Sequence, residues 1–594
     1  MKMTRKLLAV AMACATFGGF AACYDLDIAA IQPGTGTAFT REEVLEKPEL
    51  IELVIAGLFI NFWGGATYAQ PWIQLGLYGE EITSAANSSP NFNRGATQPI
   101  ILWEFAQEPR NTFDNSSTGT SFFARDPWSN FYEANAAATD LPRLVKEKNL
   151  KIIDPATGAD NTLRVMAFAK FVQGLSHVYL GMLFDSSAVI NETVDLSKVP
   201  SLPFRPHTVV IDSGIKFLEE AIGMAKQRSF VYPLKADLWV YNTAVSNDEM
   251  AAVAHSFIAR AMAYSARTPA ERAAVNWAKV KEHIQLGTTA PFGPRGLPNP
   301  LISEDYRAMV SSPPQNVAAI CTAGGTNYCG SHAGVSRVDL RLLGPADTSG
   351  AYQDWLRKVS AARFDTVTPF IVRTPDKRIQ PPTSTVPLIK PVFFKYTDVV
   401  PPITIMPTER GPYYWSNYWS SSRAVNNNTQ FPFEGGGRAR RGSNLGNSDL
   451  DEIQDAMLLP AEMDLLLAEA ELRLGNTGAA AALINKTRVG NGELPPVTGA
   501  GVPAGPGCVP KRYDGACGSL MDALMYEKRV ETYGTAIAYF DLRGWGCLLE
   551  GTPLELPPPG RQLDLLGKPL YSYGGVGRPG SAPKPTNCPL MHRP

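Results

Sequence analysis

One cysteine near the start of the sequence stands where a lipid could be attached to it. Three of the first six residues are basic, and an uncharged apolar run from Leu7 to Phe20 leads into two alanines and then Cys23. This order is typical of a secretory signal peptide, and a thiol directly after the cleavage point is the nucleophile that accepts diacylglycerol in lipoproteins. We therefore expect residues 1–22 to be removed and Cys23 to carry the lipid. An ordinary signal peptide, with Cys23 incidental, is the alternative.

The remaining cysteines suggest disulfide chemistry. Cys14 would leave with the signal peptide, and six cysteines would stay in the mature chain: Cys321, Cys329, Cys508, Cys517, Cys547 and Cys588. An even number of cysteines beyond an export signal predicts disulfides, and the spacing favours the three pairs of sequence neighbours in that order. No metal site is expected, since no C-x-x-C pair is present and the six histidines are scattered.

Carboxylates at helical spacing could in principle do acid–base chemistry. Glu527 and Glu531 lie one helical turn apart with Arg529 between them, and paired carboxylates are the groups that hydrolases use. A charged helix face or a buried Arg–Glu network is the preferred interpretation, and Glu469 and Arg488 are interpreted in the same way.

Motifs of known enzymes are missing from the sequence. It contains no Walker A, H-E-x-x-H or G-x-S-x-G pattern, and the G-x-G-x-x-G run at 575–580 follows no convincing strand and contains Pro579. We expect no catalysis and no cofactor. A secreted hydrolase remains an alternative that would need carboxylates converging in a cleft.

Aromatic side chains are the more promising ligand contacts. They gather in the segments 60–105 and 412–419, and Tyr352 and Trp355 lie between these segments. Flat aromatic faces stack on the apolar faces of sugar rings. Most of these side chains must nevertheless fill the core of a loop-rich region.

Composition narrows the class of partner. Removing the signal peptide takes away three positive charges and no negative one, so the formal net charge changes from −1 to −4. This mild balance argues against nucleic acid as a partner. Charged residues make up only 19% of the sequence, with 51 Gly and 48 Pro, which predicts much ordered loop.

The residues named above must be positioned by helices, which the apolar periodicity predicts in two separate blocks of the chain. In the first block the sequence predicts helices that begin at Thr40 and near Pro127, followed by helices at 162–184, 206–226, 248–267 and 270–287. In the second block it predicts helical segments at 457–489 and 519–534. The pattern gives a lipidated tether at 23–38 and one domain at 39–594: helical parts 39–287 and 451–545, a loop-and-hairpin insertion at 288–450, and a Pro/Gly-rich tail at 546–594.

Residues 457–489 carry a helix–turn–helix pattern with small residues at the crossing, as in a tetratricopeptide unit. Gly475-Asn476 ends the first helix and Thr477 can begin the second. Helices in antiparallel pairs predict a mainly α fold: a tetratricopeptide-like α-solenoid core with a large loop-rich insertion.

The chain resembles the SusD/RagB family of nutrient-uptake lipoproteins. Four stretches carry the resemblance: Trp128-Ser-Asn-Phe-Tyr132-Glu-Ala-Asn135; Ala167 to Phe171 through Tyr179 to Leu183-Phe184-Asp185; Ala461-Glu462, Ala468-Glu469-Ala470, Gly475, Ile484-Asn485 and Arg488; and Glu527 to Glu531 with Asp541-Leu542-Arg543-Gly544-Trp545. The chain departs from the family pattern at Thr535-Ala536, where Glu-Gly is usual, and at Ala538, where Arg is usual.

The resemblance implies a SusD-like fold and a role. It implies a lipid-anchored protein on the outer surface of the outer membrane that binds a glycan, or less often a peptide, acts with a SusC-like TonB-dependent β-barrel transporter, and is not an enzyme. It also implies a ligand-binding arc on loops, here pointing to Phe92, Asn93, Trp103, Tyr352 and Trp355. A tetratricopeptide-like scaffold that binds only protein partners is the rival hypothesis.

Overall fold

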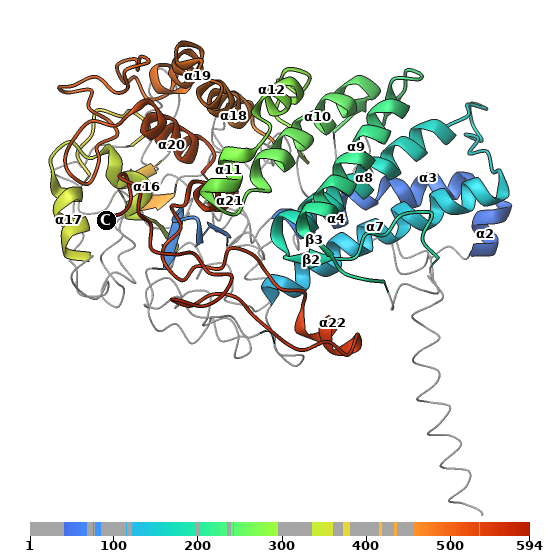
Figure 1. The fold of residues 1–594 in the computed structure, drawn as a ribbon. Helices are drawn as coiled ribbons and strands as arrows, with labels where there is room; N and C mark the ends of the chain where they lie inside the picture. The colour runs from blue at the N-terminus through green and yellow to red at the C-terminus, as the bar shows by residue number, and fades with distance from the viewer. Residues whose placement is uncertain are drawn as a thin grey trace, which may run out of the picture.

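The computed structural model describes residues 41–67, 75–76, 78–84, 115, 122–195, 202–233, 239–240, 243–294, 336–359, 372–379, 415–417, 433–435, 457–533 and 535–593. Their architecture is mainly α, which confirms the predicted fold class. Helices α7, α8, α9, α10, α12, α18 and α19 follow one another from right to left in Figure 1, while α16 and α17 lie at the left edge and α22 lies at the bottom of the coloured ribbon. The main helices of the first block are α2 (Arg41–Glu46), α3 (Glu49–Ala56), α4 (Leu58–Thr67), α7 (Phe122–Lys148), α8 (Thr162–Leu183), α9 (His207–Ala225), α10 (Asn247–Tyr264), α11 (Pro269–Ala274) and α12 (Trp277–Gln285).

Helices α8 and α9 form an antiparallel pair in which glycines bring the two backbones close together. A Cβ on Gly174 would meet Leu218 at 2.6 Å, and a Cβ on Gly214 would meet the backbone nitrogen of Val178 at 2.7 Å. Gly174 of α8 lies opposite Leu218 of α9, and Val178 lies opposite Gly214, so the two helices run in opposite directions. Glycine is the residue that allows this spacing, because any larger side chain would push the helices apart.

Aromatic packing joins the N-terminal helices to this pair. The ring of Phe62 on α4 lies 5.9 Å from Phe131 on α7 and 5.2 Å from Tyr179 on α8, centroid to centroid. By length and composition the stretch Glu49–Ala66 could cross a membrane, but 67% of it is buried inside the fold. Its apolar side chains are used in the packing of α3 and α4 against α7 and α8, as in a core helix.

The predicted helix at 270–287 is divided in two. Val275 has an extended conformation with ψ of 138°, and the side chain of Asn276 accepts a hydrogen bond from the backbone N–H of Lys279. An asparagine that caps a new helix favours this break. The result is α11 followed by α12, which packs on α10.

The second block contains α18 (Pro460–Arg473), α19 (Thr477–Gly490), α20 (Leu520–Glu531), α21 (Ile537–Trp545) and the short α22 (Gly560–Leu565). Lys486 of α19 reaches back to Asp464 of α18 at 2.7 Å, so these two helices are also antiparallel. Pro460 is the first residue of α18, as predicted, because a proline at this position lacks only an N–H that the helix would not use.

The described part of the insertion is more helical than the sequence suggested. It contains β6 (Ser336–Val338), α16 (Leu340–Leu343), the 3₁₀ turn Gly344–Ala346, α17 (Ala351–Val359), β7 (Trp415–Asn417) and β8 (Phe433–Gly435). Tyr352, Trp355 and Leu356 on α17 are all buried, and their i, i+3, i+4 spacing is that of an amphipathic helix.

Strands are short throughout the described residues. They form four two-stranded antiparallel sheets: β1 (Ile82–Ser84) with β6, β2 (Ser186–Ser187) with β3 (Arg205–Pro206), β4 (Val231–Tyr232) with β5 (Val245–Ser246), and β7 with β8. The β1–β6 pair joins the N-terminal part of the chain to the insertion, with Ile82 opposite Val338.

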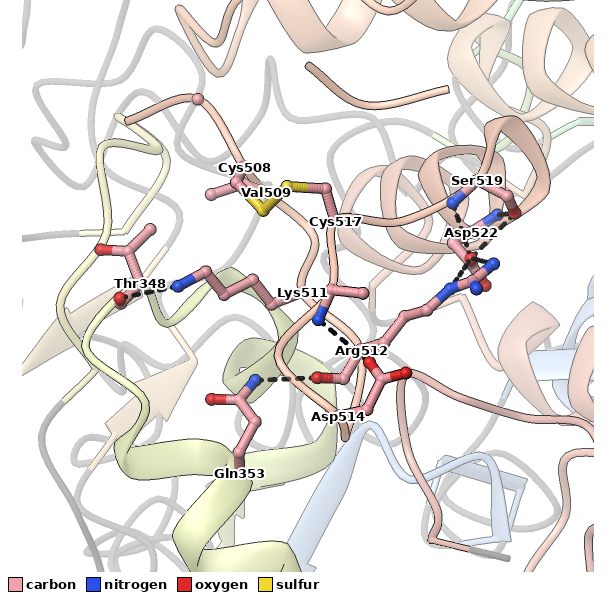
Figure 2. The surroundings of a disulfide bond; sticks show 12 residues. Thr348, Gln353, Cys508, Val509, Lys511, Arg512, Asp514, Cys517, Ser519 and Asp522 are labelled. Carbon is pink, nitrogen blue, oxygen red and sulfur yellow. Dashed lines mark hydrogen bonds and ion pairs between the residues drawn. A yellow bond between two sulfur atoms is a disulfide. The ribbon is translucent and has the colours of Figure 1, made fainter. Parts of the chain in front are cut away.

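Two disulfides lie in the C-terminal part. They join Cys508 to Cys517 and Cys547 to Cys588, the pairs of sequence neighbours that the spacing favoured. The loop closed by the first disulfide contacts the insertion, because Lys511 Nζ donates to the carbonyl of Thr348 and Gln353 donates to the carbonyl of Arg512 (Figure 2). The second disulfide holds the tail to the end of α21.

Candidate functional site

Buried charges from four helices meet in a central charge cluster of Arg272 (α11), Glu469 (α18), Lys528 (α20) and Asp541 (α21). Each side chain is at most 1% exposed. Arg272 Nη2 lies 2.6 Å from Glu469 Oε2 and 3.0 Å from Asp541 Oδ1, and Lys528 Nζ lies 2.8 Å from the same Asp541 oxygen. Trp545 donates its indole N–H to Glu469.

Electrostatics keep Glu469 ionised. Burial alone would raise the pKa of Glu469, but the charge and hydrogen bonds of Arg272, with Lys528, outweigh burial and lower the pKa to about 2. Burial raises the pKa of Asp541. Every carboxylate of the cluster faces a cation rather than a cleft, so the cluster can hold helices together and is not arranged for acid–base catalysis.

Glu527 and Glu531 belong to a second, insertion charge cluster, centred on Arg378. Arg378 Nη1 lies 2.7 Å from Glu527 and 3.0 Å from Glu531, while Nη2 lies 2.6 Å from Asp376. All four side chains are at most 1% exposed. The predicted buried Arg–Glu network is therefore present, but its arginine comes from the insertion.

Arg529, which the sequence placed beside this pair, points elsewhere. Its guanidinium donates to the backbone carbonyls of Arg341, Gly79 and Glu80. One turn of helix α20 thus holds the insertion through Glu527 and Glu531, and holds the β1 region through Arg529.

A third cluster borders a small cavity. Arg260 of α10 pairs with Glu462 of α18, with Nε to Oε1 at 3.0 Å, and donates to the hydroxyl of Tyr179 at 2.7 Å. The adjoining cavity, also lined by Leu183, has a volume of about 20 Å³. A cavity of this size holds about one water, so it is not a site for a nutrient.

The early motif at Trp128, Tyr132 and Asn135 fixes the loop that follows α8. The Trp128 ring lies 4.9 Å from that of Phe184. The Tyr132 hydroxyl donates to the carbonyl of Ala188, and the Asn135 amide donates to that of Ile190. These residues of the motif thus attach α7 to the segment that follows α8.

Tyr352 and Trp355 are not placed where a ligand could stack on them. Tyr352 is fully buried and Trp355 is 2% exposed. The Tyr352 hydroxyl donates to the carbonyl of Leu590, and the guanidinium of Arg341 lies 5.3 Å from the Trp355 ring centroid. The expectation of ligand contact is corrected for these two residues: both are buried, Tyr352 joins α17 to the C-terminal tail, and Trp355 packs against Arg341 within the insertion. Phe92, Asn93 and Trp103 lie outside the described residues, as do Cys23, Cys321 and Cys329.

A surface cluster that the sequence interpretation missed lies in the tail. The hydroxyls of Tyr571 and Tyr573 both donate to Asp185 Oδ2 at 2.7 Å. Their rings lie 5.7 Å apart in an edge-to-face arrangement, and Tyr571 is 37% exposed. The Tyr-Ser-Tyr spacing was the available signal, because residues i and i+2 of an extended chain face the same side. Nothing local in the sequence links them to Asp185.

No known metal arrangement accompanies these clusters. Within the described residues, no group of three or more His, Cys, Asp or Glu side chains could hold a metal ion. His255 and His283 approach each other, with their Nδ1 atoms 2.9 Å apart, but no third ligand joins them.

Comparisons with known proteins were made for the whole chain. No family model and no curated protein matches the sequence. Among solved structures, a SusD superfamily protein from Parabacteroides distasonis is 12% identical with a TM-score of 0.48, covering 84% of this chain and 88% of that one. One from Bacteroides fragilis is 13% identical with a TM-score of 0.46, covering 88% and 98%. A laminarin-binding SusD-like protein is 15% identical with a TM-score of 0.45, covering 89% and 98%. Over most of its length, this chain is similar to these solved proteins of the SusD superfamily.

Proposed function

We propose that this chain is a lipid-anchored, surface-exposed protein that binds a glycan and acts with a TonB-dependent outer-membrane transporter in its uptake. The observation that carries the proposal is the set of four sequence stretches resembling the SusD/RagB family, in the family's order. In the structure their residues make buried ion pairs: Arg272–Glu469 and Arg260–Glu462 join two helices, and Arg378–Glu527 joins the insertion to α20. The resemblance therefore rests on residues that the fold depends on.

Export and anchoring follow from the first 23 residues. A basic start, an apolar run and Cys23 after two alanines support secretion and lipid attachment. A lipid on one cysteine tethers a protein to a membrane without a spanning helix, although stable anchoring needs more than a single short acyl chain. A tethered binding protein can hand a ligand to a transporter in the same membrane.

A binding role is favoured over catalysis by the state of the carboxylates. The carboxylates that could have served as acid and base, Glu527, Glu531 and Glu469, are buried and ion-paired with Arg378 or Arg272. Incubation of the pure protein with polysaccharides should release no reducing ends. Turnover would favour the hydrolase hypothesis instead.

The direct test of glycan binding uses isothermal titration calorimetry on the full chain in detergent. Laminarin is the first polysaccharide to try, because one similar structure is named as laminarin-binding, followed by starch, xylan and mannan. Binding of at least one is expected. Alanine at Phe92 and Trp103 together should weaken it by roughly tenfold or more, since each aromatic removed costs about 1–2 kcal/mol of contact.

Controls separate loss of contact from loss of fold. The thermal unfolding midpoint of the double variant should match that of the wild type, and the exposed Leu53→Ala substitution should leave affinity unchanged, because Leu53 is 42% exposed on α3. Binding of peptides but of no polysaccharide would favour the peptide-binding alternative. Binding of neither, with capture of protein partners only, would favour the scaffold.

A further inference from the structure

The tail presents two tyrosines and a carboxylate on the surface as one unit, the tyrosine–aspartate cluster of Tyr571, Tyr573 and Asp185. We infer that this cluster is a further glycan contact, taking the face of a pyranose ring. The inference rests on the proposed function and adds a second contact surface to it. None of its three residues belongs to the aromatic residues expected from the family resemblance to touch a ligand.

The geometry of the cluster holds both rings in place before any ligand arrives. Asp185 Oδ2 accepts from both phenols at 2.7 Å, and Oδ1 accepts from the Ser186 hydroxyl at 3.0 Å. Each phenol O–H donates its hydrogen bond to Asp185, so the lone pairs of the phenol oxygen stay available to accept a hydrogen bond from a sugar hydroxyl. Side chains that are already ordered lose little further conformational entropy on binding.

A glycine-rich turn holds Tyr573 against the body of the protein. Gly574, Gly575, Gly577 and Gly580 all have positive φ, and a Cβ on Gly580 would meet the Tyr573 ring at 2.0 Å. The turn is bonded to the chain beside it by Gly575 N–H to the Gly551 carbonyl at 2.7 Å and by Leu554 N–H to the Gly580 carbonyl at 2.9 Å. The glycines of the G-x-G-x-x-G run at 575–580 therefore form a turn that packs against the Tyr573 ring. This packing accounts for the glycines without a bound nucleotide.

Tyr571 is fixed from the other side. The buried Asn115 amide donates to the backbone carbonyls of Tyr571 at 2.8 Å and Pro558 at 3.0 Å, and its oxygen accepts from the N–H of Gly560 at 2.9 Å. The segment that carries the tyrosines is thereby tied down at both ends. A fixed platform with 37% of Tyr571 exposed is a surface that can hold a ligand, whereas a loose tail would not be.

The chemistry of the cluster matches a sugar better than other small ligands. Aromatic rings cover the apolar C–H face of a pyranose, and carboxylate and phenol oxygens bond its hydroxyls. An anionic ligand would be repelled by Asp185. The buried Arg267 behind it is already paired with Glu555 and donates to the carbonyls of Gly181 and Phe184.

The same polysaccharide that the wild-type chain binds in calorimetry tests this inference. Tyr571→Ala with Tyr573→Ala should weaken affinity roughly tenfold, the loss of one to two stacking contacts. Tyr571→Phe with Tyr573→Phe keeps both rings but removes their hydroxyls, so it should weaken affinity clearly less than the alanine pair does. The control Leu565→Ala removes a neighbouring apolar side chain that is 69% exposed and should leave affinity unchanged.

The outcomes separate this inference from the proposed function. If the wild type and the double alanine variant bind equally well, the cluster only attaches the tail to α8 and the inference is wrong. The proposed glycan-binding role would still stand. The same holds if the phenylalanine pair loses as much affinity as the alanine pair. If the wild type binds no polysaccharide, the proposed function itself falls.

A second measurement guards against a variant whose tail detaches. Amide hydrogen exchange of the 569–582 segment of the wild-type chain should slow when the bound polysaccharide is added. Unchanged exchange in that segment, with protection elsewhere, would overturn the inference without any substitution.

Discussion

At the scale of single residues, this protein uses ionisable side chains in its interior for packing. Arg272, Arg378 and Arg260 each bind carboxylates from a helix distant in sequence, at separations of 149 to 202 residues. Removing one partner of such a pair leaves a buried charge unpaired, which costs about 3–5 kcal/mol. The arginines therefore fix which helices meet.

Ala536 is one of five non-glycine residues that have a positive φ in the described part of the chain. Ala536, where the resemblance to the family implies glycine, has a φ of 61° at the start of α21. A left-handed conformation costs a non-glycine residue about 1–2 kcal/mol. Ala536→Gly should therefore stabilise the protein by about 1 kcal/mol, measured by chemical denaturation.

A matched control exists at the end of α7. Asn149 also has a positive φ, of 49°, but asparagine tolerates this region. Asn149→Gly should change stability less than Ala536→Gly. An equal or opposite change at Ala536 would mean that its conformation carries no strain.

A buried histidine makes stability depend on pH. His177 Nδ1 donates to the carbonyl of Gln173 and Nε2 accepts from the N–H of Ile190, so the ring is neutral and both nitrogens are used. Burial lowers the pKa of His177 from 6.5 to about 4. Since the unfolded chain takes up this proton first, the stabilising contribution is complete above pH 6.5 and is lost as pH falls toward 4.

The test is the pH dependence of unfolding. His177→Gln should flatten the slope of the unfolding free energy between pH 6.5 and 4, by roughly 3 kcal/mol over the window. Identical slopes for variant and wild type would show that His177 does not titrate there. Other buried histidines keep a residual slope in both proteins, so the difference between the two is what counts.

At the scale of elements, helix pairing depends on where glycine lies. Gly214 of α9 faces the backbone of α8, whereas Gly223 of the same helix has nothing within 4 Å of where a Cβ would be. Gly214→Ala should destabilise the protein by about 1–3 kcal/mol through overpacking. Gly223→Ala should stabilise it by about 0.5–1 kcal/mol, because alanine favours a helix.

The same glycine-to-alanine change is expected to lower stability at position 214 and to raise it at position 223 of the same helix, which makes the prediction easy to contradict. Equal effects at the two positions, by urea denaturation, would show that the α8–α9 crossing is not close-packed.

The α8–α9 pair also shows what apolar periodicity can predict. The stripe at 162–184 predicted α8 almost to the residue, since its apolar positions repeat at helical spacing.

Elements whose positions depend on distant partners were harder to predict from the sequence. Helix α17 was interpreted as part of a loop-and-hairpin insertion because Pro, Gly, Ser and Thr recur between 288 and 450, although the spacing of Tyr352 and Trp355 is helical. The partner of Glu527 and Glu531 could not be identified, because Arg378 lies 149 residues from Glu527 and no local pattern marks it. The two described disulfide pairs were predictable because each joins consecutive cysteines of the sequence when these are paired in order.

At the scale of the whole molecule, the proposed role depends on the anchor. Cys23→Ser should abolish incorporation of an alkyne-labelled fatty acid and move the protein out of the membrane fraction, because Cys23 is the cysteine directly after the expected cleavage point. Cys14→Ser should change neither, since Cys14 would be removed with the signal peptide. Continued labelling of the Cys23 variant would assign the lipid to another residue.

The contacts of the tail with α8 also determine when the fold can be completed. Leu556 N–H donates to the Leu183 carbonyl at 2.8 Å, and Tyr571 bonds Asp185 across 386 residues of sequence. Under the proposed export, pairs such as α8–α9 can form as soon as they have crossed the membrane, while contacts of such high sequence separation form late. We therefore expect an exported intermediate with its helices assembled and the end of α8 uncovered. During that interval the protein would need protection by periplasmic chaperones.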